Sequence, residues 1–414
     1  MTRIFKNMSS IGILQIANYL IPLLILPVVS RILGATLFGS VGYAQNIVSY
    51  LTLLINYGFE YSATRQIALA KDDKERKNDL FWAVIASKCG LLLLSFLLLA
   101  FMPLFIPRVA CDPKLYLYTA LTNIGIVFFP TWYLQGEQQM DKMAWFNFFA
   151  KFLGAALVIA IEREASAYRL YPLLLSVASV LTGVGALWYV IRHFHIGACK
   201  LSRKALREVL AAGWPIFLNN VFVSLYTTIN MTLLGAFATD EVIGCFSAAQ
   251  RLIIALNMVV VLPVSMAIYP EISLRFEKSQ QQGMRFLSRV LLYAGLSAAL
   301  VSLLTWLTAP SVIRIVYGGG YELAIRILRW LSPIPFLVMT ATLLTVRGLY
   351  GMGLHRWAPW VGLSLAILCI SLNVTLLPTL NVKAVCLSWN MAELAECHIV
   401  GIILLTQRNR TCSI

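Results

Sequence analysis

Three cations lie inside long apolar stretches of this 414-residue sequence: Lys88, Lys151 and Arg251. An ionisable side chain in a membrane-spanning segment usually faces a cavity or a partner, so each is a candidate functional residue. A buried guanidinium or ammonium group suits an anionic ligand. The alternative for each is a side chain that snorkels to the membrane surface or bonds to a neighbouring carbonyl.

Two carboxylates also lie close together within an apolar stretch. Glu393 and Glu396 are three residues apart, so a helix places them on one face. Such a pair suits a proton or sodium site, and the alternative is a polar contact between helices. Glu60, five residues before Arg65, suits either an ion pair that holds this segment or a site for a coupling ion.

Uncharged polar groups and two further arginines complete the candidate set. Asn219, Asn220, Tyr226 and Asn230 lie along one apolar stretch, where they can hydrogen-bond a polar ligand or a neighbouring helix. Arg31 and Arg65 lie at the ends of apolar stretches. Anchoring at the membrane interface and a role in ligand entry both remain open for these two residues.

The composition indicates which elements position these residues. The chain is 59% hydrophobic and 12% charged, against about 45–50% and about 25% in a soluble domain. This excludes a soluble globular enzyme, a disordered scaffold and a coiled coil. Apolar runs long enough for membrane helices occur at residues 9–30, 41–64, 80–106, 115–134, 143–161, 168–191, 211–237, 242–270, 286–308, 323–346, 357–378 and 382–405.

The positive charges predict the orientation of these twelve spans. Of 33 Lys and Arg residues, 21 lie on the side of the two termini, nine on the opposite side and three inside spans. The positive-inside rule therefore predicts that both termini are cytoplasmic. No nucleic-acid-binding motif explains the net charge of +15. The eight scattered cysteines and four histidines predict neither a disulfide framework nor a metal or cofactor site.

An internal repeat divides the chain into two halves. Leu33-Gly34-Ala35, followed by Ala44-Gln45, recurs as Leu234-Gly235-Ala236, followed by Ala249-Gln250. Six spans in each half give the halves the same orientation, so they would be related by an axis along the membrane normal, with a substrate path between them. We predict two six-helix lobes, residues 1–198 and 199–414, which favours a transporter.

Several short motifs, in order and spacing, resemble those of a known family. They are Pro27-Val28-Val29-Ser30-Arg31-Ile32-Leu33-Gly34 with Phe38-Gly39, Tyr57-Gly58-Phe59-Glu60-Tyr61-Ser62-Ala63-Thr64-Arg65, Leu134-Gln135-Gly136, the segment from Ser224 to Ala249, and the segment from Asn373 to Pro378. The sequence thereby resembles the Wzx-type O-antigen flippases of the multidrug/oligosaccharidyl-lipid/polysaccharide exporter (MOP) superfamily. This family is related to lipid II flippases and more distantly to MATE antiporters.

The resemblance implies a fold and a function. The fold would be an all-α integral membrane protein of about twelve helices, with two six-helix lobes around a central cleft. The protein would move undecaprenyl-pyrophosphate-linked oligosaccharide repeat units across the bacterial inner membrane by alternating access, driven by H⁺, Na⁺ or the membrane potential. Its partners would be this substrate, membrane lipids and other polysaccharide-assembly membrane proteins. No enzymatic activity and no nucleic acid are expected.

The cations and polar groups named above would then bind the pyrophosphate and the sugars. Two alternatives remain. A MATE-type antiporter of small cations should have acidic residues as its main buried charges, whereas the deepest charges here are Arg251, Lys88 and Lys151. A membrane polysaccharide polymerase or glycosyltransferase should have a long outer loop that carries catalytic residues, and no connection between the predicted spans exceeds about 25 residues.

Overall fold

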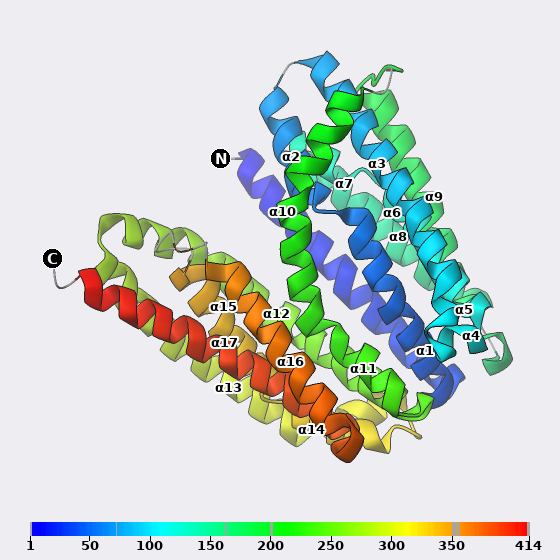
Figure 1. Ribbon diagram of the computed structural model, residues 1–414, viewed down its shortest axis with the longest axis vertical. Coiled ribbons are helices and arrows are strands. Elements are labelled where there is room, and N and C mark those ends of the chain that lie inside the picture. Colours follow the sequence, from blue (N-terminus) through cyan, green and yellow to red (C-terminus); the bar gives the residue numbers. More distant parts are fainter. Residues whose placement is uncertain are drawn as a thin grey trace. The chain divides into compact units, whose positions relative to one another are not determined.

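The protein, seen in a computed structural model, is built from helices, and the residues that the structure describes contain no β-strand (Figure 1). These residues are 2–71, 73–161, 164–198, 202–349, 354 and 357–411. They form two units, Met1–Val221 and Phe222–Ile414. The predicted all-α class is confirmed over this part of the chain. The units divide within a helix, whereas we placed the lobe boundary after residue 198, which stays a prediction.

The first unit begins with a long kinked helix. Its elements are α1 (Thr2–Asn56), α2 (Phe59–Ala70), α3 (Lys74–Phe101), η1 (Met102–Leu104), α4 (Pro107–Cys111), α5 (Pro113–Ala120), α6 (Thr122–Phe128), α7 (Thr131–Gly136), α8 (Met140–Ile161), η2 (Ala165–Ala167), α9 (Leu170–His193) and the larger part of α10 (Arg203–Thr227). α8 packs along α1, and both α6 and α8 pack against α9.

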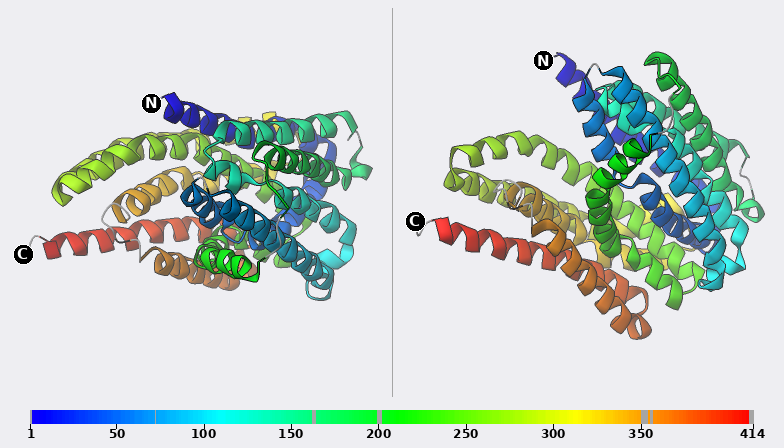
Figure 2. Two further views of the ribbon diagram at one scale, coloured as in Figure 1. Left: turned by 90° about the horizontal axis from the view of Figure 1, so that it is seen from above. Right: turned by 45° about the horizontal axis from the view of Figure 1, so that its top comes forward.

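The second unit contains the remaining helices. They are α11 (Ile229–Phe237), α12 (Asp240–Lys278), α13 (Gln280–Tyr317), α14 (Glu322–Leu331), α15 (Ile334–Thr342), the π-helix η3 (Leu343–Leu349), α16 (Ala358–Leu380) and α17 (Val382–Thr411). α16 and α17 lie side by side, as both views of Figure 2 show, and α12 packs against α13 and α14.

Several helix ends follow from local sequence signals. Asp73 caps α3 by accepting a hydrogen bond from the backbone N–H of Arg76 at 2.9 Å. Ser279 caps α13 by accepting from the N–H of Gln282 at 3.1 Å. Each side-chain oxygen satisfies one of the free N–H groups of a first helical turn, which favours the start of a helix at that residue.

Several predicted spans are interrupted. Those at 211–237 and 323–346 are divided between consecutive helices, α10 and α11 in the first and α14, α15 and η3 in the second. Two further interruptions have local causes. The segment predicted at 41–64 ends as α1 at Asn56, because Tyr57 (φ 44°) and Gly58 (φ 80°) are in left-handed conformations. The segment predicted at 115–134 consists of the three short helices α5, α6 and α7. Phe129 is extended before Pro130, as a residue before proline tends to be, and this separates α6 from α7.

The first two predicted spans also share one element. α1 passes through Gly34, whose φ of 67° and ψ of 174° are open to glycine and strained for other residues. Gly34 belongs to the repeated Leu-Gly-Ala motif. Over the described residues, nine helical stretches are long and apolar enough to cross a membrane. The predicted total of twelve spans stays a prediction.

Large apolar side chains on the outside of the helices indicate that lipid surrounds the protein. Exposed examples are Leu93, Leu97, Phe105, Leu292, Leu296 and Leu303. A water-soluble protein rarely exposes so much contiguous apolar surface, whereas lipid solvates it. Helices are also one of the two structures that satisfy every backbone polar group within a bilayer. The chain is a multi-pass membrane protein.

Two glycines let α6 and α9 approach closely. A Cβ atom on Gly183 of α9 would lie 2.3 Å from the backbone oxygen of Gly125 in α6. A Cβ atom on Gly125 would lie 2.3 Å from the backbone carbon of Ser179 in α9. Small residues at such crossings are the usual route to tight packing of membrane helices. This contact packs the short helix α6 against α9 within the first unit.

We therefore expect Gly183→Ala to destabilise the protein by about 1–3 kcal/mol, because the added methyl group overpacks a backbone contact. The thermal unfolding midpoint of the detergent-purified protein measures this. Gly185→Ala is the matched control: it lies on the same helix, and a Cβ atom there meets nothing within 4 Å. Equal midpoints for the two variants would contradict the proposed role of this crossing.

Candidate functional site

Lys88 lies halfway along α3 and is enclosed by the first unit. Its side chain is 1% exposed, and its Nζ donates a hydrogen bond to the backbone oxygen of Ile126 in α6 at 3.4 Å. The carboxylate of Glu60 is close enough to act on the ammonium group electrostatically. The ammonium group is therefore bonded to a carbonyl of its own unit and lies within electrostatic range of Glu60.

A buried amide lies on the same helix as the carbonyl that holds Lys88. Asn123 is three residues before Ile126, so the two residues are neighbours on α6. Its Oδ1 accepts a hydrogen bond from Thr52 Oγ1 of α1 at 2.7 Å, while its Nδ2 has no partner among the described residues. Lys88 and Asn123 give the first unit a polar interior where α1, α3 and α6 meet.

The other predicted cations of this unit lie on its outside. Lys151 on α8, Arg31 on α1 and Arg65 on α2 are exposed, as is Glu60 at the start of α2. Asn219 and Asn220 lie on α10, the first exposed and the second partly buried. The side chain of Tyr226 lies outside the described residues. The structure thus separates the predicted cations of the first unit into one buried residue and three exposed ones.

Arg251 lies on α12 of the second unit and is partly buried. Its Nε donates a hydrogen bond to Ser247 Oγ, one helical turn earlier, at 3.4 Å. Its charge also acts on the phenol of Tyr321, which directly precedes α14. The neighbouring Tyr317 donates from its hydroxyl group to the backbone oxygen of Ala248 at 2.8 Å. The guanidinium group therefore lies near the contact of α12 with α14.

Each carboxylate of the acidic pair on α17, Glu393 and Glu396, accepts a hydrogen bond from a side chain. Glu393 is 7% exposed, and its Oε1 accepts from Trp389 Nε1 at 3.2 Å. Glu396 Oε1 accepts from Thr345 Oγ1 at 2.8 Å. Thr345 belongs to the π-helix η3, a rare element that often lies at functional sites. The charge of Glu396 acts electrostatically on the carboxyl group of Glu393.

Sequence analysis named Asn230 as a candidate polar residue but did not predict the amide cluster that it forms with Asn373. Asn230 of α11 and Asn373 of α16 are both fully buried. Asn230 Oδ1 accepts hydrogen bonds from Asn373 Nδ2 at 2.8 Å and from Cys369 Sγ at 3.3 Å, and the charge of Glu393 acts on the Cys369 thiol. Asn373 Oδ1 has no partner in the described part of the chain. The available signal was an amide inside each of two apolar runs.

The second unit therefore contains neighbouring buried and partly buried polar groups. They are the amides of α11 and α16, the carboxylates of α17 and the hydroxyl group of η3. Carboxylate, amide and hydroxyl oxygens are hard ligands, suited to a small hard cation such as sodium or to a proton. The site combines two acidic groups with an amide oxygen that has no partner, so it can hold positive charge.

Comparison with known proteins gives the context of these sites. Residues 4–276 match the family described as polysaccharide biosynthesis protein. A protein of Escherichia coli (strain K12) named "Putative O-antigen transporter" is 30% identical over 352 residues, 85% of this chain and 84% of that protein. A protein of Shigella dysenteriae with the same name is 26% identical over 350 residues, 82% of this chain and 84% of that protein.

Solved structures share the fold at low sequence identity. The lipid II flippase MurJ in an inward closed conformation aligns with a TM-score of 0.78 and 13% identity, over 96% of this chain and 86% of that one. An inward-facing multidrug resistance MATE family transporter of the MOP superfamily aligns with a TM-score of 0.74 and 15% identity, over 97% and 99%. The match over residues 4–276, about two thirds of the chain, and the 30% identity to the Escherichia coli protein show that the chain belongs to the family described as polysaccharide biosynthesis protein.

Proposed function

We propose that this protein is a flippase for undecaprenyl-pyrophosphate-linked oligosaccharide repeat units, which it moves from the cytoplasmic to the periplasmic leaflet by alternating access. The observation that carries this proposal is the 30% identity to a named O-antigen transporter over 85% of the chain. The shared fold with a lipid II flippase supports it, because both substrates would combine a prenyl chain, a pyrophosphate and sugars.

The substrate makes a physical demand that the buried polar residues can meet. A pyrophosphate and several sugars lose their hydration while crossing about 30 Å of hydrocarbon. Arginine replaces part of that hydration by binding phosphate oxygens with two N–H groups. Arg251 supports this role, since its side chain is only partly buried and its Nε donates a hydrogen bond within its own helix, to Ser247 Oγ at 3.4 Å. Lys88, Lys151, Arg31 and Arg65 are further candidates, with Asn219, Asn220 and Tyr226 for the sugars.

The driving force belongs to the same proposal. Glu393 and Glu396 would bind a proton or a sodium ion, because two neighbouring carboxylates stabilise one positive charge between them. Their partners on α16, α17 and η3 would transmit that binding to the helices around them. Glu60 is the further candidate. The protein would lie in the bacterial inner membrane with both termini in the cytoplasm, alongside other membrane proteins of polysaccharide assembly.

We expect Arg251→Ala to lower O-antigen display at least about tenfold, because a hydrogen bond to a charged group contributes about 1.5–3 kcal/mol. Display is measured as the lipopolysaccharide ladder of a strain that lacks the gene and carries the variant, at equal protein amount. Arg251→Lys should retain part of the display, since it keeps the charge and loses the planar fork. Arg285→Ala, an exposed cation of the same unit, is the control.

The same strain tests the function itself. With Arg251→Ala, lipid-linked repeat units should accumulate on the cytoplasmic leaflet. Unchanged display in each of Arg251→Ala, Lys88→Ala and Lys151→Ala would contradict the role of these cations. A wild-type protein that restores resistance to a cationic drug but no ladder would overturn the flippase in favour of an antiporter.

For the driving force, the double variant Glu393→Gln and Glu396→Gln should lose the response of transport to an ion gradient, because neither amide can take up a proton or balance a sodium charge. The measurement is flipping of the lipid-linked substrate in proteoliposomes under an imposed proton or sodium gradient. Glu241→Gln, an exposed carboxylate on α12, is the control. A double variant that still responds to the gradient would refute the assignment.

A further inference from the structure

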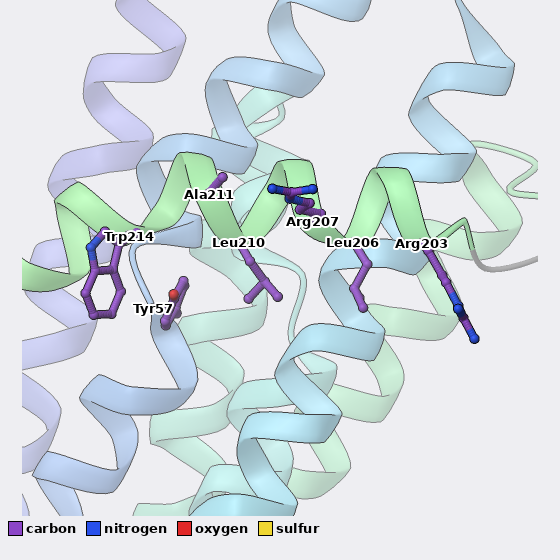
Figure 3. Close-up of a pocket in the computed structure, with 7 residues that line it drawn as sticks. All are labelled: Tyr57, Arg203, Leu206, Arg207, Leu210, Ala211 and Trp214. Carbon is purple, nitrogen blue, oxygen red and sulfur yellow. The ribbon is translucent and has the colours of Figure 1, made fainter.

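A cavity of about 510 Å³ lies in the first unit, between α10 and the break that joins α1 to α2. Six of its lining residues carry the argument: Tyr57, Arg203, Leu206, Arg207, Leu210 and Trp214. Five of them recur on α10 at steps of three, one, three and four residues, which places them on one helical face. Figure 3 shows Trp214, Leu210, Arg207, Leu206 and Arg203 in this order along α10, with Tyr57 close to Trp214.

The cationic end of this cavity has no counter-charge. Arg203 and Arg207 are exposed, and neither has an ion-pair partner in the part of the chain that the structure describes. The neighbouring cations differ, since Arg76 of α3 pairs with Glu208 and Lys77 pairs with Glu137 at 2.6 Å. Because Arg76 engages the carboxylate next to Arg207, two guanidinium groups remain available to an anion.

The other end of the cavity is apolar and firmly held. Tyr57 stacks on Phe217 with ring centroids 4.9 Å apart. A Cβ atom on Gly58 would lie 2.7 Å from Ile216, and one on Gly213 would lie 2.7 Å from the backbone oxygen of Tyr57. α10 therefore rests directly on the helix break. Trp214, 48% exposed, leaves an aromatic surface uncovered beside Tyr57.

The cavity thus changes from cationic to apolar along α10. The eleven steps from Arg203 to Trp214 rise about 16 Å, half the thickness of the hydrocarbon core. The segment from Ala35 to Asn56 rises about 33 Å, which places the break after it near a membrane boundary. On the predicted topology this boundary is the cytoplasmic one, where basic pockets between membrane helices bind anionic headgroups.

We propose that this cavity binds one anionic phospholipid of the surrounding membrane. Its phosphate would contact Arg203 and Arg207, and the first methylene groups of its chains would lie against Leu206, Leu210 and Trp214. A free phosphate would leave the apolar wall uncovered. The site is separate from the residues assigned to transport, so this proposal does not depend on the flippase function.

The wild-type protein tests the proposal without any variant. Detergent-purified protein is titrated with short-chain phosphatidylglycerol, short-chain phosphatidylcholine, inorganic phosphate or undecaprenyl diphosphate. The readouts are the thermal unfolding midpoint and the lipid retained in native mass spectrometry. We expect phosphatidylglycerol alone to raise the midpoint saturably and to be retained as one molecule. An equal effect of phosphatidylcholine, a full effect of inorganic phosphate, or displacement by undecaprenyl diphosphate at lower concentration would each overturn it.

The double variant Arg203→Gln and Arg207→Gln locates the site. We expect its dissociation constant for phosphatidylglycerol to rise at least about tenfold, because it loses both charge-assisted contacts. The double variant Lys204→Gln and Lys74→Gln removes the same charge from exposed residues outside the cavity and should bind as the wild type does. Unchanged affinity in the arginine variant, or an equal loss in the lysine variant, would exclude this cavity as the site.

Discussion

The absence of water from the hydrocarbon core is the constraint on which the rest of the structure depends. Every polar group placed there has to find its partner within the protein. Lys88 finds a carbonyl oxygen on α6, Asn373 finds Asn230, and Glu396 finds Thr345. Lys88, Asn373 and Glu396 each join two helices in this way, so a substitution at any of the three also changes helix packing.

Glycines and helix breaks allow the helices to pack closely enough for buried polar groups to find partners within the protein. Close approach at Gly125 and Gly183 brings α6 against α9, and Gly58 with Gly213 brings α10 onto the end of α1. Where a helix stops within or at the edge of the hydrocarbon core, its free backbone groups need local partners. The breaks at Gly58 and before Pro130 therefore lie in closely packed surroundings, beside buried residues such as Phe59 and Trp132.

Part of the fold and part of the site could be predicted from the sequence. The apolar runs were sufficient for an all-α membrane protein, and the spacing of Glu393 and Glu396 was sufficient to place both on one face. The interruptions at Gly58 and Pro130 were not anticipated, because the runs around them stay apolar and hydropathy does not register a backbone turn. The contact of Asn230 with Asn373 was also missed, because α11 and α16 are distant in the chain, and the buried Asn123 of α6 was not singled out.

The sequence by itself determined the class of protein, since the shortage of charge and the length of the apolar runs are properties of composition that no packing can change. It also determined which few polar residues enter the membrane. Only the tertiary structure decided how they are used: Lys88 is enclosed while Lys151 is exposed, and Arg76 is neutralised while Arg203 and Arg207 are not. The physical reason is that a charge is compensated by groups near it in space, and chain order does not reveal them.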